Sequence, residues 1–230
     1  MDRPEAILLD FYGTVVEEDD PVIASVRQTI YASATANDPA DPKAVGAYWW
    51  ALFSDLCATS AGQTFATQRE LERRSLQGTL EYFGSDADED SLSNQLFEYW
   101  RRPPIFPDAK EFLHQIARPV CIVSNIDRSD IEAAINYHGL PIDLLVTSED
   151  ARAYKPRPGP FHLALELLGL APAQVLHVGD SLTADVRGAN ALGIPVAWVN
   201  RKAKTTPPQT RVHYETPDLE SLAHLLTRQR

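Results

Sequence analysis

The sequence predicts an α/β fold: a doubly wound parallel sheet with an inserted bundle of α-helices. A short apolar run occupies residues 6–9, and beyond residue 104 further short apolar runs alternate with helical segments. Such alternation is typical of a parallel sheet covered on both faces. Between these parts, residues 17–104 show helical periodicity without strand-like alternation. We therefore expect a core domain of residues 1–16 and 105–230, and an α-helical domain of residues 17–104.

The first strand is predicted over residues 6–9, where the apolar run AILL leads into DFYGT. Gly13 and Thr14 indicate a change from strand to loop. Since glycine tolerates backbone conformations that other residues avoid, this loop can fold closely around an anion.

The helical block has start signals and a regular apolar spacing. Asp20-Pro21 and Asp41-Pro42 each read as an N-cap followed by proline in the first helical position. Apolar residues then recur at steps of three and four, as expected for helices that bury one face. They are Val22, Val26 and Ile30; Val45, Trp49, Leu52, Phe53 and Leu56; Leu76, Leu80 and Phe83; and Leu92, Leu96 and Trp100.

Beyond residue 104, further strands are predicted over 119–125, 144–148, 174–180 and 195–200. Helical periodicity occupies 108–117, 129–137, 160–169 and 183–192. Residues 202–217 have the composition of an irregular loop, and 217–228 that of a final helix.

Composition and charge exclude several kinds of function. With 21 basic and 32 acidic side chains, the formal net charge is −11, which repels a nucleic-acid backbone. No apolar run reaches the roughly 18 residues of a membrane-spanning helix. The two cysteines, Cys57 and Cys121, are too few for a disulfide framework and favour the cytoplasm. We expect a monomer or homodimer that binds neither nucleic acid nor membrane.

Polar side chains follow the predicted strands, and in an open α/β sheet ligands bind at this edge. They are Asp10, Ser124 with Asn125, Lys155, and Asp180 with Asp185. Converging carboxylates repel one another unless a cation lies among them, and hard oxygen ligands suit Mg²⁺. Lys155 could pair with a carboxylate and a phosphoryl oxygen, and Asp10 could act as a nucleophile. The sequence therefore predicts one shared active site for a small anionic substrate.

The motifs DFYGT, SN, KPRP and GDSLTAD, in this order, resemble those of the haloacid dehalogenase superfamily of hydrolases. The resemblance covers essentially the whole chain and implies a Rossmann-like core with an α-helical cap of the first type. It implies that Asp10 is the nucleophile, that Thr14 and Ser124 position the transferred group, and that Lys155 balances charge. We place Asn125 with Thr14 and Ser124 in the substrate-binding set, and Tyr12 with Asp10 and Lys155 in the catalytic set. It also implies metal binding by Asp10, Asp180, Asp185 and the backbone carbonyl of Tyr12.

Tyr12 departs from the phosphatases of this superfamily, which carry a second aspartate two residues after the nucleophile. A phenol, with a reference pKa of about 10, is a poor base at neutral pH. Tyr12 instead matches the D-x-Y-G-T motif of the 2-haloacid dehalogenases, which need no metal, and residues 197–201 also resemble that branch. Those enzymes, however, replace the acid pair of the fourth motif with serine and asparagine, and carry a tyrosine where this chain has Phe161.

Three functions follow from this mixture of motifs. We favour a Mg²⁺-dependent phosphatase that acts on a small phosphorylated metabolite through an aspartyl-phosphate intermediate, because Asp180 and Asp185 set the charge of the site. The alternative is a metal-independent 2-haloacid dehalogenase that uses the same nucleophile. The third reading is a catalytically weak protein that binds a metabolite.

Other polar and aromatic residues are interpreted as structural. Arg69, Arg73 and Arg74 are expected to pair with nearby acids on a solvated helix face. Trp49, Trp50 and Trp100 are expected in the core of the bundle. His177, within an apolar strand, is expected to be a buried, hydrogen-bonded residue, and the six histidines lack the spacing of a zinc site.

Overall fold

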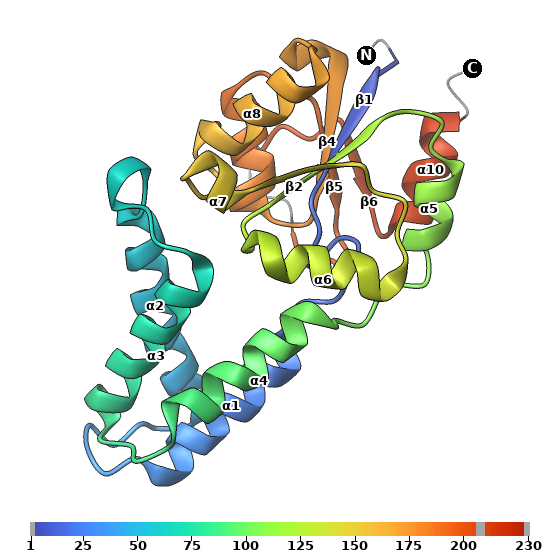
Figure 1. Cartoon of the computed structure of the whole chain (residues 1–230). Coiled ribbons are helices and arrows are strands. Elements are labelled where there is room, and N and C mark those ends of the chain that lie inside the picture. Colours follow the sequence, from blue (N-terminus) through green and yellow to red (C-terminus); the bar gives the residue numbers. More distant parts are fainter. Residues whose placement is uncertain (1–2, 206–209, 228–230) are drawn as a thin grey trace. The chain divides into compact units, whose positions relative to one another are not determined.

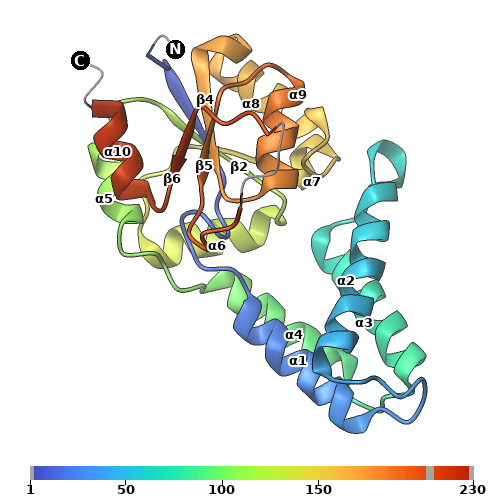
Figure 2. The ribbon, with the colours of Figure 1, turned by 180° about the vertical axis from the view of Figure 1, so that it is seen from behind.

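A computed structural model describes residues 3–205 and 210–227. The chain divides into two compact units, the first formed by residues 1–18, 104–125 and 138–230, and the second by residues 19–103 and 126–137. We call the first the α/β unit and the second the helical unit (Figures 1 and 2). Among the described residues, no helix is both long and apolar enough to cross a membrane.

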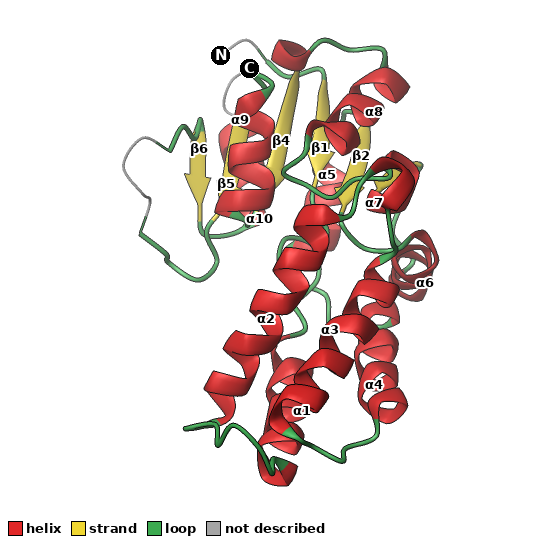
Figure 3. Cartoon of the chain, turned by 90° about the vertical axis from the view of Figure 1, so that its left-hand side faces the viewer, coloured by secondary structure: helices red, strands yellow, loops and turns green. Residues whose placement is uncertain are grey.

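The α/β unit contains a six-stranded, fully parallel sheet in the order β3-β2-β1-β4-β5-β6. Figure 3 shows β6, β5, β4, β1 and β2 side by side. The strands are β1 (Ala6–Leu9), β2 (Val120–Ser124), β3 (Leu144–Thr147), β4 (Val175–Gly179), β5 (Val196–Val199) and β6 (Tyr214–Thr216). Every residue of β1, β4 and β5 is buried, because helices cover both faces of a parallel sheet. The predicted α/β fold class is confirmed.

The helices of the sheet lie in two layers. On one face α8 (Pro158–Leu168) packs on β2 and β3, near α9 (Gly188–Ala191) and the π-helical turn Leu182–Arg187. On the other face α5 (Ala109–Gln115) packs against α10 (Leu219–Thr227) (Figure 2). Short helical segments complete the unit: α7 (Ser148–Ala151) and a 3-10 turn over Pro172–Gln174.

One strand departs from the prediction. Residues 202–217 were expected to be irregular, yet Tyr214–Thr216 form β6 and pair with Ala197, Trp198 and Val199 of β5. The segment is three residues long and has a charged residue at its centre, so its sequence carries little strand signal. The strand forms because backbone N–H and C=O groups along the edge of β5 need hydrogen-bond partners, which residues 214–216 provide. Residues 206–209 and 228 of the predicted loop and final helix lie outside the described residues.

The helical unit contains the four inserted helices predicted between the first two strands. They are α1 (Asp20–Ser33), α2 (Pro42–Thr59), α3 (Gln68–Phe83) and α4 (Glu89–Arg101), with a 3-10 turn over Gly62–Thr64. The carboxylate of Asp41 caps α2 as predicted, accepting a hydrogen bond from the Ala44 amide at 2.8 Å. At α1 the N-cap is Asp19, one residue before the predicted position. Trp49 and Trp100 are buried as predicted, whereas Trp50 is 68% exposed, so its predicted place in the core is wrong.

The helical unit also includes residues 126–137, which hold most of α6 (Arg128–His138). Asp127 accepts hydrogen bonds from the Gln68 and Arg69 amides at 2.7 and 3.0 Å, and so satisfies free N–H groups at the start of α3. Asp130 is fully buried and forms a bidentate salt bridge with Arg69. Arg69 was expected on a solvated face with local partners. That expectation is wrong, because its partner comes from a segment 61 residues away.

Candidate active site

Asp10, directly after β1, is bound by Lys155 and Thr14. The Lys155 Nζ donates to Asp10 Oδ1 at 2.7 Å, and the Thr14 hydroxyl donates to Asp10 Oδ2 at 3.1 Å. All three residues are buried. Burial raises the pKa of Asp10 to about 6 against the opposing effect of Lys155, and the charge of Asp185 adds to the rise. Asp10 thus has an oriented carboxylate that is ionised at neutral pH.

Lys155 joins Asp10 to Asp185. Its Nζ also donates to Asp185 Oδ1 at 2.7 Å and to the Val123 carbonyl at 2.8 Å. Burial lowers the pKa of Lys155, but the two carboxylates outweigh this effect and hold its pKa above the ordinary value. Because the ammonium stays charged, two of the three carboxylates share a cation supplied by the chain.

The amide of Asn125 holds the backbone of Lys155. Its Oδ1 accepts from the Lys155 N–H at 2.7 Å, and its Nδ2 donates to the Lys155 carbonyl at 3.1 Å. Asn125, which the sequence places in the substrate-binding set, therefore also positions the backbone of the lysine. Ser124, at the end of β2, is also buried.

Both carboxylate oxygens of Asp185 have hydrogen-bond partners within the α/β unit. Oδ1 accepts from Lys155 and contacts His177 Nε2 at 2.9 Å, while Oδ2 accepts from the Ser181 amide at 3.0 Å. Burial raises the pKa of Asp185, but Lys155 and His177 outweigh it and keep the pKa well below its usual range. Its backbone neighbours approach closely: a Cβ on Gly179 would lie 2.4 Å from the Asp185 Cγ.

His177 is fully buried in β4 and bound to Asp185, as predicted for a structural histidine. Burial lowers the pKa of its imidazole. Its ring packs edge-on against Phe161 with centroids 5.1 Å apart. The apolar run around His177 predicts its burial but not its contact with Asp185, because that contact depends on the turn after β4 that carries Asp185.

Asp180, directly after β4, differs from the other two aspartates. Burial raises its pKa to about 8, and the charges of Asp10 and Asp185 add to this. Among the described residues, no ammonium or guanidinium forms a salt bridge with Asp180. Such a carboxylate binds either a proton or a cation at neutral pH.

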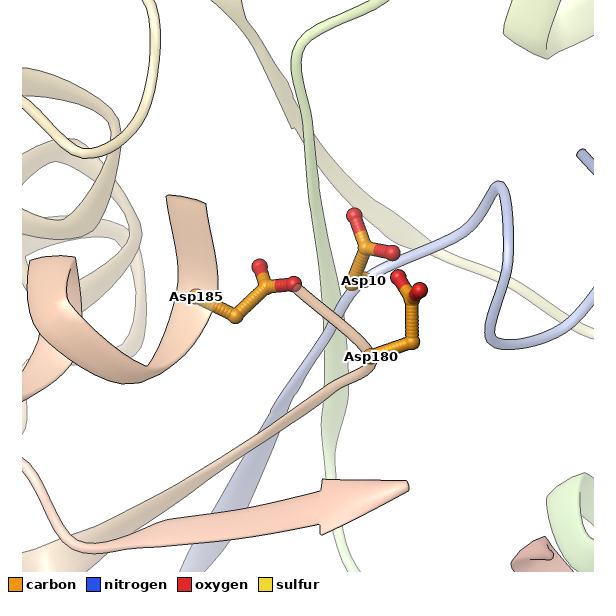
Figure 4. A group of neighbouring side chains, drawn as sticks. All are labelled: Asp10, Asp180 and Asp185. Carbon is orange, nitrogen blue, oxygen red and sulfur yellow. The ribbon is translucent and has the colours of Figure 1, made fainter. Parts of the chain in front are cut away.

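The three aspartates form a candidate metal site. Asp10, Asp180 and Asp185 each offer an oxygen within 4.8 Å of the others, and Figure 4 shows their side chains converging from separate segments. Gly13 allows this approach, because a Cβ there would lie 2.7 Å from Asp180 Oδ1 and its φ is +86°. A hard divalent cation would neutralise Asp180, so the donor set fits Mg²⁺.

A parallel α/β sheet that holds a buried aspartate between a threonine hydroxyl and a lysine ammonium has the groups that a hydrolase with an aspartate nucleophile requires. Residues 4–193 match the family model described as haloacid dehalogenase-like hydrolase, and the chain belongs to this family. The resemblance drawn from the four motifs is confirmed.

Two curated relatives are named for different activities. Haloacetate dehalogenase H-2 of Moraxella sp. (strain B) is 27% identical over 98% of this chain and 99% of its own length. Phosphoserine phosphatase of Thermus thermophilus is 29% identical over 57% of this chain and 55% of its own length. The dehalogenase match therefore includes the inserted helices, while the phosphatase match covers about half of each protein.

Two solved structures share the fold. L-2-haloacid dehalogenase of Xanthobacter autotrophicus, with chloropropionic acid covalently bound, has a TM-score of 0.75 and 22% identity over 99% of this chain and 100% of its own. The putative HAD-hydrolase YfnB of Bacillus subtilis, bound to magnesium, has a TM-score of 0.74 and 22% identity over 98% of this chain and 100% of its own. At this identity the likeness shows the fold alone.

Proposed function

We propose that this chain is a hydrolase that releases halide from a small 2-haloacid, with Asp10 as the nucleophile. The observation that carries the proposal is Tyr12, two residues after Asp10. A halide leaves without being protonated, whereas the alkoxide of an alkyl phosphate needs a general acid, and a missing acid–base group typically costs about 10²–10⁴ in rate. A tyrosine at this position therefore suits halide displacement. This reverses the order of the two enzymatic readings drawn from the sequence.

Two further observations support the proposal. The dehalogenase relative matches the chain almost end to end, and the phosphatase relative only over about half. In addition, Lys155 lies 2.7 Å from both Asp10 and Asp185, so the chain itself supplies a cation beside the nucleophile. An anionic haloacid would meet less repulsion there than at an unpaired carboxylate.

The proposed reaction has two steps. A carboxylate oxygen of Asp10 attacks the carbon that bears the halogen, a C–O bond forms, and the halide leaves with the bonding electron pair. Water then attacks the carbonyl carbon of the resulting ester, which releases the 2-hydroxyacid and restores the Asp10 carboxylate with loss of one proton. The Thr14 hydroxyl and the Lys155 ammonium hold the two oxygens of Asp10 during this cycle.

A Mg²⁺-dependent phosphatase is the second candidate, and Asp180 favours it. This carboxylate has two acidic neighbours within 4.8 Å, a feature that halide displacement does not require. Asp10 and Asp180 would hold the ion, together with Asp185 and the Tyr12 carbonyl predicted from the motifs. Bound Mg²⁺ would supply positive charge for a phosphoryl group. Substrates with good leaving groups, such as acyl phosphates, suit a site in which Tyr12 replaces the general acid.

A paired assay on charge-matched variants tests the proposal. Chloride release from 2-chloropropionate and phosphate release from acetyl phosphate and p-nitrophenyl phosphate are measured with Mg²⁺ and with a chelator. The variants are Asp10→Asn, Asp180→Asn and, as a control, Asp143→Asn, which changes an exposed aspartate of the same unit. We expect chloride release in the presence of chelator, lost in Asp10→Asn and retained in Asp180→Asn and Asp143→Asn.

Other results contradict the proposal in distinct ways. Phosphate release that requires Mg²⁺ and disappears in both Asp10→Asn and Asp180→Asn would establish the second candidate. Absence of turnover in all assays, with tight binding of Mg²⁺ or a metabolite by calorimetry, would establish the catalytically weak binding protein.

A further inference from the structure

Thr14 is held at two ends, by its hydroxyl and by its carbonyl. The hydroxyl donates to Asp10 Oδ2 at 3.1 Å, and the carbonyl accepts from Arg201 Nη2 at 2.8 Å. Thr14 is fully buried. We infer that Arg201 is a positioning residue for the nucleophile, which acts through the backbone of Thr14 and does not touch the reacting atoms.

Arg201 is itself fixed by partners outside the nucleophile loop. The same Nη2 lies 3.0 and 3.2 Å from the two carboxylate oxygens of Asp108, and the guanidinium carbon lies 3.8 Å from the centroid of the Phe106 ring. Asp108 also accepts a hydrogen bond from the Leu219 amide at 2.6 Å, at the start of α10. A guanidinium held by an ion pair and an aromatic face has little freedom to turn.

Residues 104–108, which include the Arg201 partners Phe106 and Asp108, also bind the loop after Asp10 through backbone hydrogen bonds. The Phe106 amide donates to the Val15 carbonyl at 3.1 Å, and the Glu17 amide donates to the Pro104 carbonyl at 2.8 Å. Residues 104–108 thus fix the loop beyond Thr14, and Arg201 fixes Thr14 itself. A misplacement of about 1 Å can cost about 10²-fold in rate, so this support matters for an attacking carboxylate.

Lysine would not reproduce these contacts. An ammonium is a point charge, whereas the planar guanidinium can stack on Phe106 while it bridges Asp108 and the Thr14 carbonyl. A cavity of about 480 Å³ borders Arg201 and Asp108 and is also lined by Phe112, Asp218 and His224. After Arg201→Ala this cavity would adjoin the vacated space, so added guanidinium ion could reach the Thr14 carbonyl.

A double-mutant cycle tests whether Arg201 acts through Thr14. This inference rests on the proposed function only in taking Asp10 as the nucleophile, and either substrate class serves for the assay. We expect Arg201→Ala to lower kcat about 10- to 100-fold with little change in KM, and millimolar guanidinium to restore part of the loss. Arg201→Lys should retain an intermediate kcat. In a protein that already carries Thr14→Val, the further change Arg201→Ala should lower kcat by less than about threefold, because Arg201 acts through Thr14.

Hydrogen exchange gives a readout that does not depend on activity. In Arg201→Ala, amides of residues 11–17 should exchange faster than in the wild type, whereas those of β2 and β4 should not. The control is Arg211→Ala, which removes an exposed arginine of the same unit. Fold-losses that multiply in the double variant would overturn the inference, as would unchanged exchange over 11–17. Absence of turnover on every substrate contradicts the proposed function, and exchange alone then decides the role of Arg201.

Discussion

The ammonium of Lys155 donates to the carboxylate of Asp10 at 2.7 Å, with both side chains nearly removed from water. The same ammonium binds Asp185 at 2.7 Å. One buried cation is therefore shared by two buried carboxylates, and its removal leaves both without a counter-charge.

Lys155→Met should damage stability and activity together. Breaking a buried ion pair by removing one partner costs about 3–5 kcal/mol, and loss of the charge beside the nucleophile should lower kcat by about 10²–10³. Urea denaturation and steady-state kinetics measure the two effects. Lys43→Met, at an exposed position of α2, should change neither, and a Lys155→Met variant as stable as the wild type would refute the shared-cation account.

Gly13→Ala should abolish most activity for a reason specific to its neighbour. The added Cβ would lie 2.7 Å from Asp180 Oδ1, and φ at Gly13 is +86°. Gly193→Ala is the matched control, since its φ is +72° with no atom within 4 Å of the added Cβ. Both variants should lose about 1 kcal/mol from backbone strain, but only Gly13→Ala should lower kcat, by at least about tenfold. Equal activity in the two variants would show that the contact with Asp180 is unimportant.

The salt bridge of Arg69 with Asp130 should be a main stabilising contact of the helical unit. Asp130 is fully buried and Arg69 is 32% exposed, with contacts of 2.7 and 2.5 Å. Arg69→Ala would leave a buried carboxylate without its partner, at a cost of about 2–4 kcal/mol once exposure of the arginine is considered. Arg74→Ala, on the exposed side of α3, should change the free energy of unfolding by less than about 0.5 kcal/mol. Comparable losses in both variants would contradict the assignment.

Glu72 should make the protein less stable as pH rises. Burial raises its pKa from 4.5 to about 8, with a contribution from the charge of Asp19, and its Oε1 has no hydrogen-bond partner among the described residues. Between these two values the unfolded chain releases the proton that the folded chain keeps, so the free energy of unfolding falls as pH increases from 4.5 to 8.

Glu72→Gln should remove this dependence and stabilise the protein at pH 7 by an amount on the order of 1–3 kcal/mol. Thermal and urea unfolding at several pH values measure it. Glu166→Gln, at an exposed site, should leave the pH profile as it is in the wild type. A profile unchanged by Glu72→Gln would mean that Glu72 is ionised in the folded protein.

Much of the fold and the grouping of the site were predictable from local patterns. Apolar runs at β1, β2 and β4 each end at a polar residue, and parallel strands bring those ends to one edge. This logic places Asp10 near Asp180 and Asp185 without knowledge of side-chain geometry. The edge strand β6 escaped prediction because its pairing is decided by β5.

Long-range partners could not be predicted in the same way. The partner of Arg69 is 61 residues away, and local spacing suggested a nearby acid instead. The hydrogen bonds of the Asn125 amide with the Lys155 backbone could not be predicted either, because they join residues 30 positions apart in the sequence. The four motifs identify the family but not the substrate, because Tyr12 favours a haloacid and Asp180 favours a phosphorylated substrate.

The position of isotope after a single turnover tests the central claim, that Asp10 forms a covalent ester with a haloacid. Excess protein is mixed with 2-chloropropionate in water enriched in the heavy oxygen isotope, and both the lactate and the peptide containing Asp10 are analysed by mass spectrometry. We predict one heavy oxygen in the Asp10 carboxylate and none in the lactate, since water attacks the carbonyl carbon of the ester. Heavy oxygen in the lactate with an unlabelled Asp10 would contradict the account.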